Sequence, residues 1–234
     1  AHDANLIRPM EDTDLERICA AAKQLPKLKV TVAPENVSLP QVRQLVDAGV
    51  LVSLGHTDAP FETCIAYARA GASCATHLFN AMSQMGNRAP GLVGAVLDTP
   101  QLSAGVIADG IHVHPASLRA AWVAKRRTPG QIFLVSDAMA VAGTSETEFL
   151  LEGRRITRME GRLCLLDGTL AGADLDLTTA LAVLTRHCGI PLSEALTAAT
   201  STPAGLIGQK CDLSRPGQAL KDMIRIAPDL SRAT

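Results

Sequence analysis

The chain alternates between short apolar runs and longer amphipathic stretches, which predicts strands followed by helices. Apolar runs of strand length lie at 28–34, 50–54, 72–76, 102–108 and 131–136. Apolar residues at helical spacing predict helices over 11–25, 40–48, 59–70 and 115–125. Thr13 and Glu16 have the spacing of a capping box at the start of the first of these helices. Strands that alternate with helices and are apolar throughout are typical of a parallel sheet buried on both faces.

The pattern changes after Gly143. Residues 148–172 are typical of short antiparallel strands, with a turn near Glu160 and Gly161. Apolar positions at helical spacing then predict helices over about 174–187 and 193–207. The tail from Leu213 to Ile226 is compatible with a strand of a small side domain.

The composition narrows the class of protein. With 22 basic and 23 acidic residues and no basic block, the chain has no feature of a nucleic-acid partner. No uncharged apolar run approaches the ~20 residues that a membrane span needs, so no membrane partner is expected. Six scattered cysteines without a Cys-x-x-Cys pair predict reduced thiols and a cytoplasmic location. One Trp, one Tyr and four Phe leave the core to Ala, Val, Leu and Ile.

Polar residues follow the predicted strands at the point where each strand ends. His56 and His77 each come just after an apolar run, and neighbouring parallel strands would bring their side chains together. Two imidazoles with open positions for a carboxylate and water indicate a metal site. The alternative is a pair of unrelated core histidines.

Asp137 follows a further strand, in LVSDAM, and has no cationic neighbour in the sequence. A carboxylate beside an activated water can take its proton and later give it to a leaving amine. The alternative role is a helix N-cap.

In the loop after His77, Asn80 and Arg88 suit a phosphate or carboxylate, although a solvated surface arginine is the other interpretation. His112 is a candidate substrate contact, whereas His114 is interpreted as structural.

Glu35 also follows a strand. Glu35, His56 and His77 are spaced by 21 residues and imitate a Glu-His-His ligand set. Spacing alone leaves this carboxylate open as a third ligand.

At this point the chain resembles the N-acetylglucosamine-6-phosphate deacetylase family of the amidohydrolase superfamily. The resemblance rests on VTVAPEN, GHTDA, ATHLFNAM, RAPGLVGAVLD, ADGIHVHP, LVSDAM, GTLAGADL and ATSTPAGLIG, in family order over nearly all of residues 1–210. It implies an α/β fold, a TIM-type (β/α)₈ barrel that is incomplete in this chain. It also implies metal-dependent hydrolysis of the acetamide of N-acetylglucosamine 6-phosphate to glucosamine 6-phosphate and acetate.

The resemblance also implies roles for single residues. His56 and His77 would bind a divalent metal, with Zn first and Fe, Mn or Co as alternatives, and Asp137 would be the catalytic acid and base. Asn80, Ala81 and Arg88 would contact the sugar phosphate, the arginine reaching a neighbouring subunit of a homodimer. The residues expected to contact the rest of the substrate are His2, Asp109, Gly110, Ile111, His112, Leu170, Ala171 and Gly172.

The sequence departs from the family pattern by lacking the segment that carries the family's carboxylate ligand. The family's carboxylate ligand lies in a His-Leu-Glu-Gly-Pro segment that this sequence lacks, so the resemblance removes Glu35 from the ligand set. The 234 residues are therefore interpreted as a segment of a longer chain, with a partial barrel over 1–212 and the strand or tail of a small β domain over 213–234. Such a segment is expected to be poorly active. Alternatives are an amidohydrolase for a different N-acyl sugar or N-acyl amino acid, or an inactive fragment that only binds or assembles.

Overall fold

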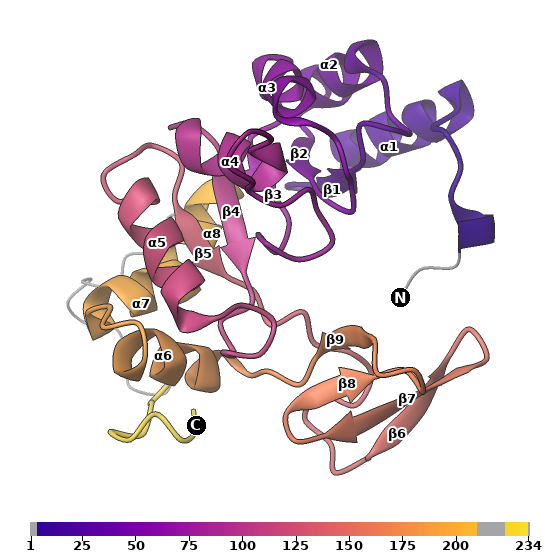
Figure 1. Cartoon of the computed structure of the whole chain (residues 1–234). Helices are drawn as coiled ribbons and strands as arrows, with labels where there is room; N and C mark the ends of the chain where they lie inside the picture. Colours follow the sequence, from indigo (N-terminus) through magenta and orange to yellow (C-terminus); the bar gives the residue numbers. More distant parts are fainter. Residues whose placement is uncertain (1–3, 210–222, 234) are drawn as a thin grey trace.

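The computed structural model describes residues 4–209 and 223–233 and contains two separate sheets (Figure 1). The first sheet is parallel, with five strands paired in sequence order. Its strands are β1 (Lys29–Val32), β2 (Leu51–Leu54), β3 (Cys74–Ala75), β4 (Ser103–Val106) and β5 (Ile132–Leu134). The five expected strands and their parallel arrangement are confirmed, although β3 is only two residues long.

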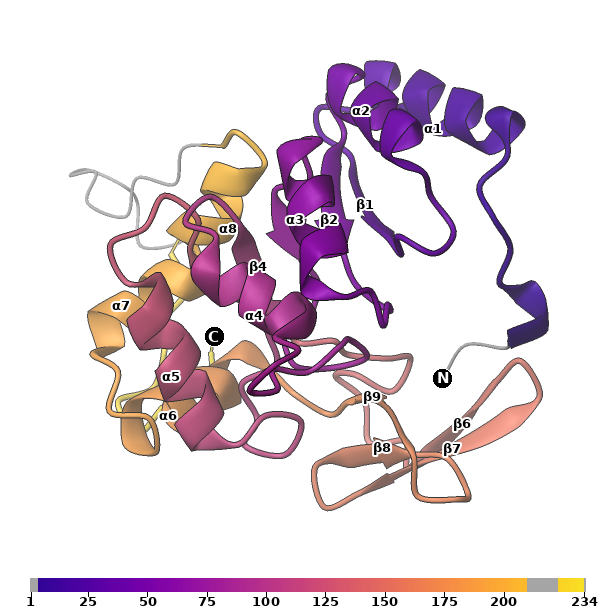
Figure 2. The same ribbon diagram turned by 45° about the horizontal axis from the view of Figure 1, so that its top comes forward.

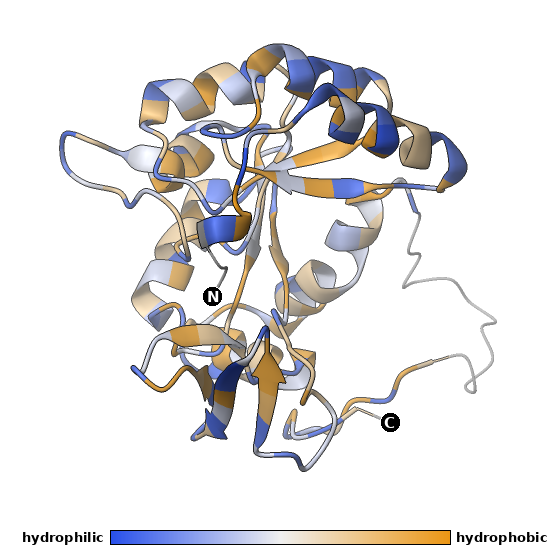
Figure 3. Ribbon diagram, turned by 90° about the vertical axis from the view of Figure 1, so that its right-hand side faces the viewer, coloured by the Kyte–Doolittle hydropathy of each residue, from blue (hydrophilic) through white to orange (hydrophobic). Residues whose placement is uncertain are grey.

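Helices alternate with the strands and pack against one another in chain order on one side of the parallel sheet (Figures 1 and 2). They are α1 (Asp12–Gln24), α2 (Leu39–Asp47), α3 (Phe61–Arg69), α4 (Gly91–Asp98) and α5 (Pro115–Lys125), preceded by a 3₁₀ turn, η1 (Ala4–Leu6). Their inward side chains are aliphatic, such as Val42 and Leu45 of α2, both fully buried. Figure 3 shows the same division, with apolar strands at the centre and polar positions on the outer helices.

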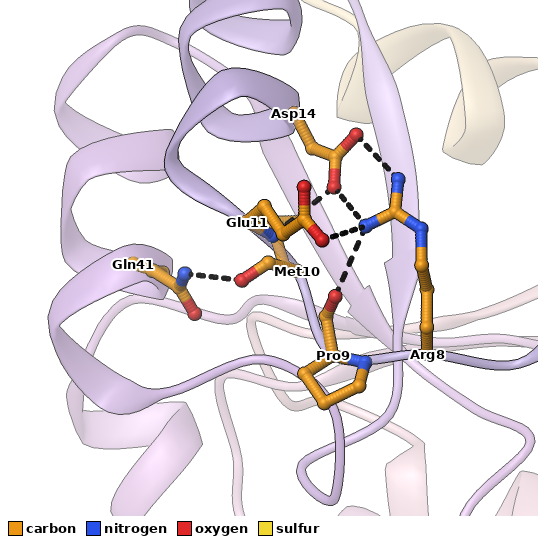
Figure 4. A network of polar contacts seen from close by, with 6 residues as sticks. All are labelled: Arg8, Pro9, Met10, Glu11, Asp14 and Gln41. Carbon is orange, nitrogen blue, oxygen red and sulfur yellow. Dashed lines mark hydrogen bonds and ion pairs between the residues drawn. The ribbon is translucent and has the colours of Figure 1, made fainter.

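The start of α1 differs from the sequence-based prediction. The capping box is formed by Glu11 and Asp14, so Thr13 lies inside the helix and the prediction of a Thr13 cap was wrong. Arg8 stabilises the capping box at Glu11 and Asp14, because its guanidinium binds both oxygens of Asp14, at 2.5 and 2.8 Å (Figure 4). Gln41 Nε2 of α2 donates to Met10 O at 2.9 Å and ties this corner to the next helix.

The helix α4 was not expected, because its sequence GLVGAVLD has no polar face. Six of its eight residues are buried, so the helix is apolar all round and lies inside the molecule. Gly91 opens it with a φ of +61°, and a Cβ at this position would lie 2.5 Å from Ser83 O. Only glycine allows the loop after β3 to pass this close to the helix.

The parallel sheet is curled. Lys29 Nζ of β1 lies 5.6 Å from the ring centroid of Phe133 in β5, although three strands separate the two in the sheet. Leu51, Cys74 and Phe133 form a buried cluster on the concave side, where Leu206 packs against them. Within the described residues, β1 and β5 remain the edges of the sheet, so the strands form a curled, open sheet.

The second sheet is antiparallel, as expected for 148–172, and its four strands pair in sequence order. The strands are β6 (Glu148–Leu151), β7 (Arg154–Met159), β8 (Arg162–Cys164) and β9 (Leu170–Ala173). Glu160 and Gly161 form the turn between β7 and β8, both with positive φ. Val141, Ile156 and Leu163 give this sheet a small core of its own.

The chain then returns to the parallel sheet through α6 (Leu177–Arg186), α7 (Leu192–Ala199) and α8 (Ser201–Leu206). A single helix over 193–207 was expected, and that prediction was wrong because the backbone breaks at Thr200. Pro203 accounts for the break, since a continuous helix would place its ring against the carbonyl of Ala199.

The C-terminal tail, the cysteines and the lengths of the helices were also predicted from the sequence. Most of the tail strand expected from Leu213 to Ile226 lies outside the described residues, and Ile226 forms only an isolated bridge with Ala233. The described cysteines, all except Cys211, are free. In the part of the chain that the structure describes, no helix has the length and apolar character needed to cross a membrane.

Candidate active site

A cavity of about 730 Å³ lies where the carboxyl ends of the parallel strands face the antiparallel sheet. Residues from the exits of β2, β3 and β5 form one wall, and residues of β9 and of the turn after β6 form the other. The predicted site residues among its lining are His56, His77, Asn80, Ala81, His112, Asp137, Leu170, Ala171 and Gly172.

The two predicted metal ligands lie in direct contact. His56 Nε2 and His77 Nε2 are 2.9 Å apart, and the rings meet edge to face with centroids 4.8 Å apart. Both residues have a left-handed backbone, with φ of +50° for His56 and +32° for His77. This conformation costs about 1–3 kcal/mol for a residue other than glycine and is concentrated at functional sites. The chain therefore turns sharply after β2 and β3 and directs both imidazoles to one point.

Asp137 lines the same cavity and also has a left-handed backbone, with φ of +50°. Its carbonyl accepts a hydrogen bond from Ala173 N at 3.0 Å, and Ala138 bridges Ala173, so β9 anchors this exit. The residues that follow Asp137 form turns and no helix. The alternative role as a helix N-cap is therefore wrong.

His112 is oriented by Asp109. His112 Nδ1 and Asp109 Oδ2 are 2.5 Å apart, and both side chains are almost fully buried. Burial alone would raise the pKa of Asp109, but hydrogen bonds from the His112 ring and from the backbone N–H groups of Ile111 and His112 together lower it. Because Nδ1 is engaged by the carboxylate, Nε2 is the ring nitrogen available to the cavity. Asp109, Gly110 and Ile111 do not themselves line it.

Arg88 lies apart from the other predicted residues. Its side chain is exposed, in the loop before α4, and it does not line the cavity. His2 lies outside the described residues. His114, interpreted as structural, caps α5 by accepting from Ala116 N at 3.1 Å.

Some residues that line the cavity were not predicted from the sequence. The additional lining residues are Ile107, Ala138, Met139, Leu151, Glu152 and Thr169. Ala138 and Met139 follow Asp137 and could have been found from that position. Leu151, Glu152 and Thr169 come from the antiparallel sheet, and no local pattern indicates that this sheet faces the strand exits.

Glu35 does not line the cavity. Its carboxylate accepts hydrogen bonds from Thr57 Oγ1 and from the backbone N–H of Asp58. Its acceptor capacity is used in holding the segment after His56, which agrees with its removal from the ligand set.

The residues fit a metal ion in part. Two imidazole nitrogens converge beside a carboxylate, and imidazole is a common ligand of Zn, Fe and Co. Among the described residues, however, no group of three or more His, Cys, Asp or Glu side chains is placed to hold one ion. His77 Nδ1 is buried and has no hydrogen-bond partner in the described part of the chain. The described residues thus supply an incomplete set of ligands.

The known proteins that this chain resembles are deacetylases of amino-sugar phosphates. No family model matches the chain. It is 41% identical over 178 residues to N-acetylgalactosamine-6-phosphate deacetylase of Shewanella sp. (strain ANA-3), which covers 76% of this chain and 45% of the relative. It is 35% identical over 210 residues to N-acetylglucosamine-6-phosphate deacetylase of Vibrio furnissii, covering 89% of this chain and 51% of the relative. Over most of its length the chain is similar to N-acetylglucosamine- and N-acetylgalactosamine-6-phosphate deacetylases.

Solved structures of such deacetylases have the same fold. The structure from Pasteurella multocida matches with a TM-score of 0.83 at 33% identity, over 89% of this chain and 54% of that one. A complex of a Mycobacterium smegmatis deacetylase variant with N-acetyl-D-glucosamine-6-phosphate matches with a TM-score of 0.80 at 31% identity, over 89% and 55%. The chain spans about half the length of the curated deacetylases it matches.

Proposed function

We propose that the protein acts in hydrolysis of the acetamide of N-acetylglucosamine 6-phosphate, to give glucosamine 6-phosphate and acetate. The observation that carries the proposal is the contact of His56 Nε2 with His77 Nε2 at 2.9 Å in a cavity that Asp137 also lines. The similarity to curated and solved deacetylases of amino-sugar phosphates supports it.

His56 and His77 would hold a divalent metal, with Zn as the first choice and Fe, Mn or Co as alternatives. When bound, such an ion polarises the amide carbonyl and acidifies water. The two imidazoles must be neutral at their contacting nitrogens to bind it, so acid is expected to release the metal.

The side chains around the pair would divide the remaining work. The Asp137 carboxylate takes a proton from the attacking water and delivers it to the sugar nitrogen as the amide bond breaks. His112, fixed by Asp109 at Nδ1, presents Nε2 to the substrate. Asn80 and Ala81 would contact the phosphate at the rim of the cavity.

Arg88 would serve the site of a second copy. Its exposed side chain lies outside the cavity of its own chain, and its fork can hold a phosphate with two hydrogen bonds. This supports a homodimer in which each arginine reaches the neighbouring cavity. His2, outside the described residues, is proposed as a further substrate contact.

The test is acetate release from N-acetylglucosamine 6-phosphate by the purified protein with added Zn²⁺ or Co²⁺. Asp137→Asn should retain the metal and lose turnover by a factor of about 10²–10⁴, the range for a missing acid or base. A variant that keeps the wild-type rate would contradict the role of Asp137. An Asp176→Ala variant, which removes the N-cap of α6 outside the cavity, is the control.

A second substrate is supported by the relatives themselves. Two of them, from Shewanella sp. (strain ANA-3) and Escherichia coli O157:H7, are N-acetylgalactosamine-6-phosphate deacetylases. The two sugars differ only at C4, so the ratio of kcat/KM for the two phosphates decides between them.

A further inference from the structure

The segment that follows β1 is hydrogen-bonded to the segment that follows β2 through one carboxylate, that of Glu35. Thr57 Oγ1 lies 2.8 Å from Glu35 Oε1 and 2.6 Å from Oε2, and the N–H of Asp58 donates to Oε1 at 2.9 Å. The Thr57 hydroxyl also accepts from Ala59 N at 3.0 Å. Thr57 is only 4% exposed, whereas Glu35 reaches it from the surface of the molecule. The contact between the two exits is therefore specific and well satisfied.

The residue that Glu35 holds comes directly after His56. His56 has a left-handed backbone, which is uncommon for residues other than glycine and persists where the surroundings fix it. On its amino-terminal side Gly55 N donates to Val32 O at 3.2 Å, and on its carboxyl-terminal side Thr57 is fixed by Glu35. With both neighbours fixed to β1 or its exit, the imidazole of His56 points toward His77.

The same threonine also reaches the loop that carries Asn80. Thr57 N donates to Ala81 O at 3.2 Å, and Ser83 N donates to Thr57 O at 2.9 Å. Thr57 therefore joins three strand exits, those of β1, β2 and β3. A change at Glu35 is transmitted first to Thr57 and from there to the residues after β2 and β3, which form one wall of the cavity.

We propose that Glu35 is a positioning residue that fixes His56 against His77 through Thr57. Its role in metal binding rests on the metal site proposed above. Glu35 does not line the cavity, so its effect is on the geometry of the pair. Residues that orient metal ligands from behind typically change metal affinity by about 10–100-fold when they are removed.

Three variants separate this role from a general effect on folding. Glu35→Ala removes the carboxylate, and Thr57→Val removes the hydroxyl while keeping the shape of the side chain. Glu35→Gln is the conservative variant, because its amide oxygen can accept from Thr57 and Asp58 while its NH₂ donates to the Thr57 hydroxyl. The matched control is Asp176→Ala, since Asp176 also accepts from a threonine hydroxyl, at 2.8 Å, and from a backbone N–H, at 2.7 Å, outside the cavity.

The first measurement is Co²⁺ affinity, followed by the visible absorption of the bound ion. Glu35→Ala and Thr57→Val should weaken binding by about tenfold or more and alter the spectrum. Glu35→Gln should restore both toward wild type, and Asp176→Ala should change only the thermal midpoint. Unchanged affinity and spectrum in folded Glu35→Ala would overturn the proposal.

The second measurement uses the metal-free protein, so it does not depend on the proposed function. The ¹⁵N chemical shifts of the imidazoles report the contact between His56 Nε2 and His77 Nε2. In Glu35→Ala the His56 signals should move to the values of a freely solvated imidazole, and in Asp176→Ala they should stay. If the wild type binds no Co²⁺, the metal site is wrong, and identical histidine shifts in Glu35→Ala and wild type would separately refute the role of Glu35.

Discussion

Gly172 of β9 lies directly against Met139, two residues after Asp137. A Cβ at Gly172 would be 2.5 Å from Met139 Sδ and 3.3 Å from Asp137 O. The antiparallel sheet therefore approaches the exit of β5 so closely that a side chain at Gly172 would require the Met139 side chain to move. Gly172 was expected to contact the substrate, and in the structure it both lines the cavity and permits this approach.

Gly172→Ala should therefore displace the Asp137 segment. We expect a loss of about 1–3 kcal/mol in stability from overpacking, with a larger loss of turnover. Gly172→Ala with Met139→Ala should recover most of the stability, because the crowded atoms are gone. Gly205→Ala, where a Cβ meets nothing within 4 Å, is the control. Denaturant midpoints and acetate release check these outcomes, and wild-type turnover in Gly172→Ala would contradict them.

Arg158 of β7 holds the segment that follows Asp137. Its guanidinium donates to the carbonyls of Val141, Thr144 and Glu146 and lies 2.9 Å from Asp174 Oδ1. Arg158→Met should cost about 2–4 kcal/mol, because several charge-assisted hydrogen bonds are lost and Asp174 keeps a half-buried charge.

Hydrogen exchange localises the effect of Arg158→Met. Amides of residues 139–146 should exchange faster, while those of β2 and β3 should be unchanged. Arg155→Met is the control, since Arg155 forms an exposed ion pair with Glu148 in the same sheet. Equal exchange in the two variants would show that Arg158 does not hold this segment.

The pair of Asp109 and His112 should make stability depend on pH. The pKa of Asp109 is lowered in the folded protein, so the unfolded chain binds more protons over the acidic range. The stabilising contribution is complete above the usual aspartate pKa of about 4 and is lost as pH falls through the lower, folded value.

Urea unfolding of wild type and Asp109→Asn checks this relationship. The difference in unfolding free energy should shrink as the pH falls below about 4. Asp167→Asn provides a comparison with an exposed aspartate whose pKa is lowered by hydrogen bonds from Thr169. A difference for Asp109→Asn that grows on acidification would have the wrong sign.

Arg88→Ala should raise KM for the phosphorylated sugar and leave hydrolysis of unphosphorylated N-acetylglucosamine unchanged. If Arg88 serves a neighbouring copy, mixing Arg88→Ala with Asp137→Asn should give more activity at low concentrations of the phosphorylated sugar than either variant has alone. One site of the mixed dimer then has an intact Asp137 and an intact arginine. Equal losses on both sugars would argue against phosphate binding, and failure of the mixture would argue against exchange between copies.

The sequence allowed the parallel strands and their polar exits to be predicted because that information is local. An apolar run followed by His56, His77 or Asp137 marks the end of a strand wherever the strand lies in the sheet. The contact of the two imidazoles followed from the rule that neighbouring parallel strands end at one edge.

Other features depend on contacts that are distant in sequence. The helix α4 lacks a polar face, so periodicity could not distinguish it from a loop, and only its burial explains it. The break at Thr200 has a local cause in Pro203, which the apolar spacing concealed. The approach of Leu151, Glu152 and Thr169 to the strand exits results from how the two sheets pack, which no short pattern records.

The left-handed backbone shared by His56, His77 and Asp137 has a consequence for protein engineering. Valine, isoleucine or threonine at these three positions would be rejected on steric grounds before any chemistry was tested. Asparagine tolerates this conformation, so a replacement library built on asparagine and glycine separates loss of a functional group from collapse of the turn. Alanine scanning of these turns would confuse the two.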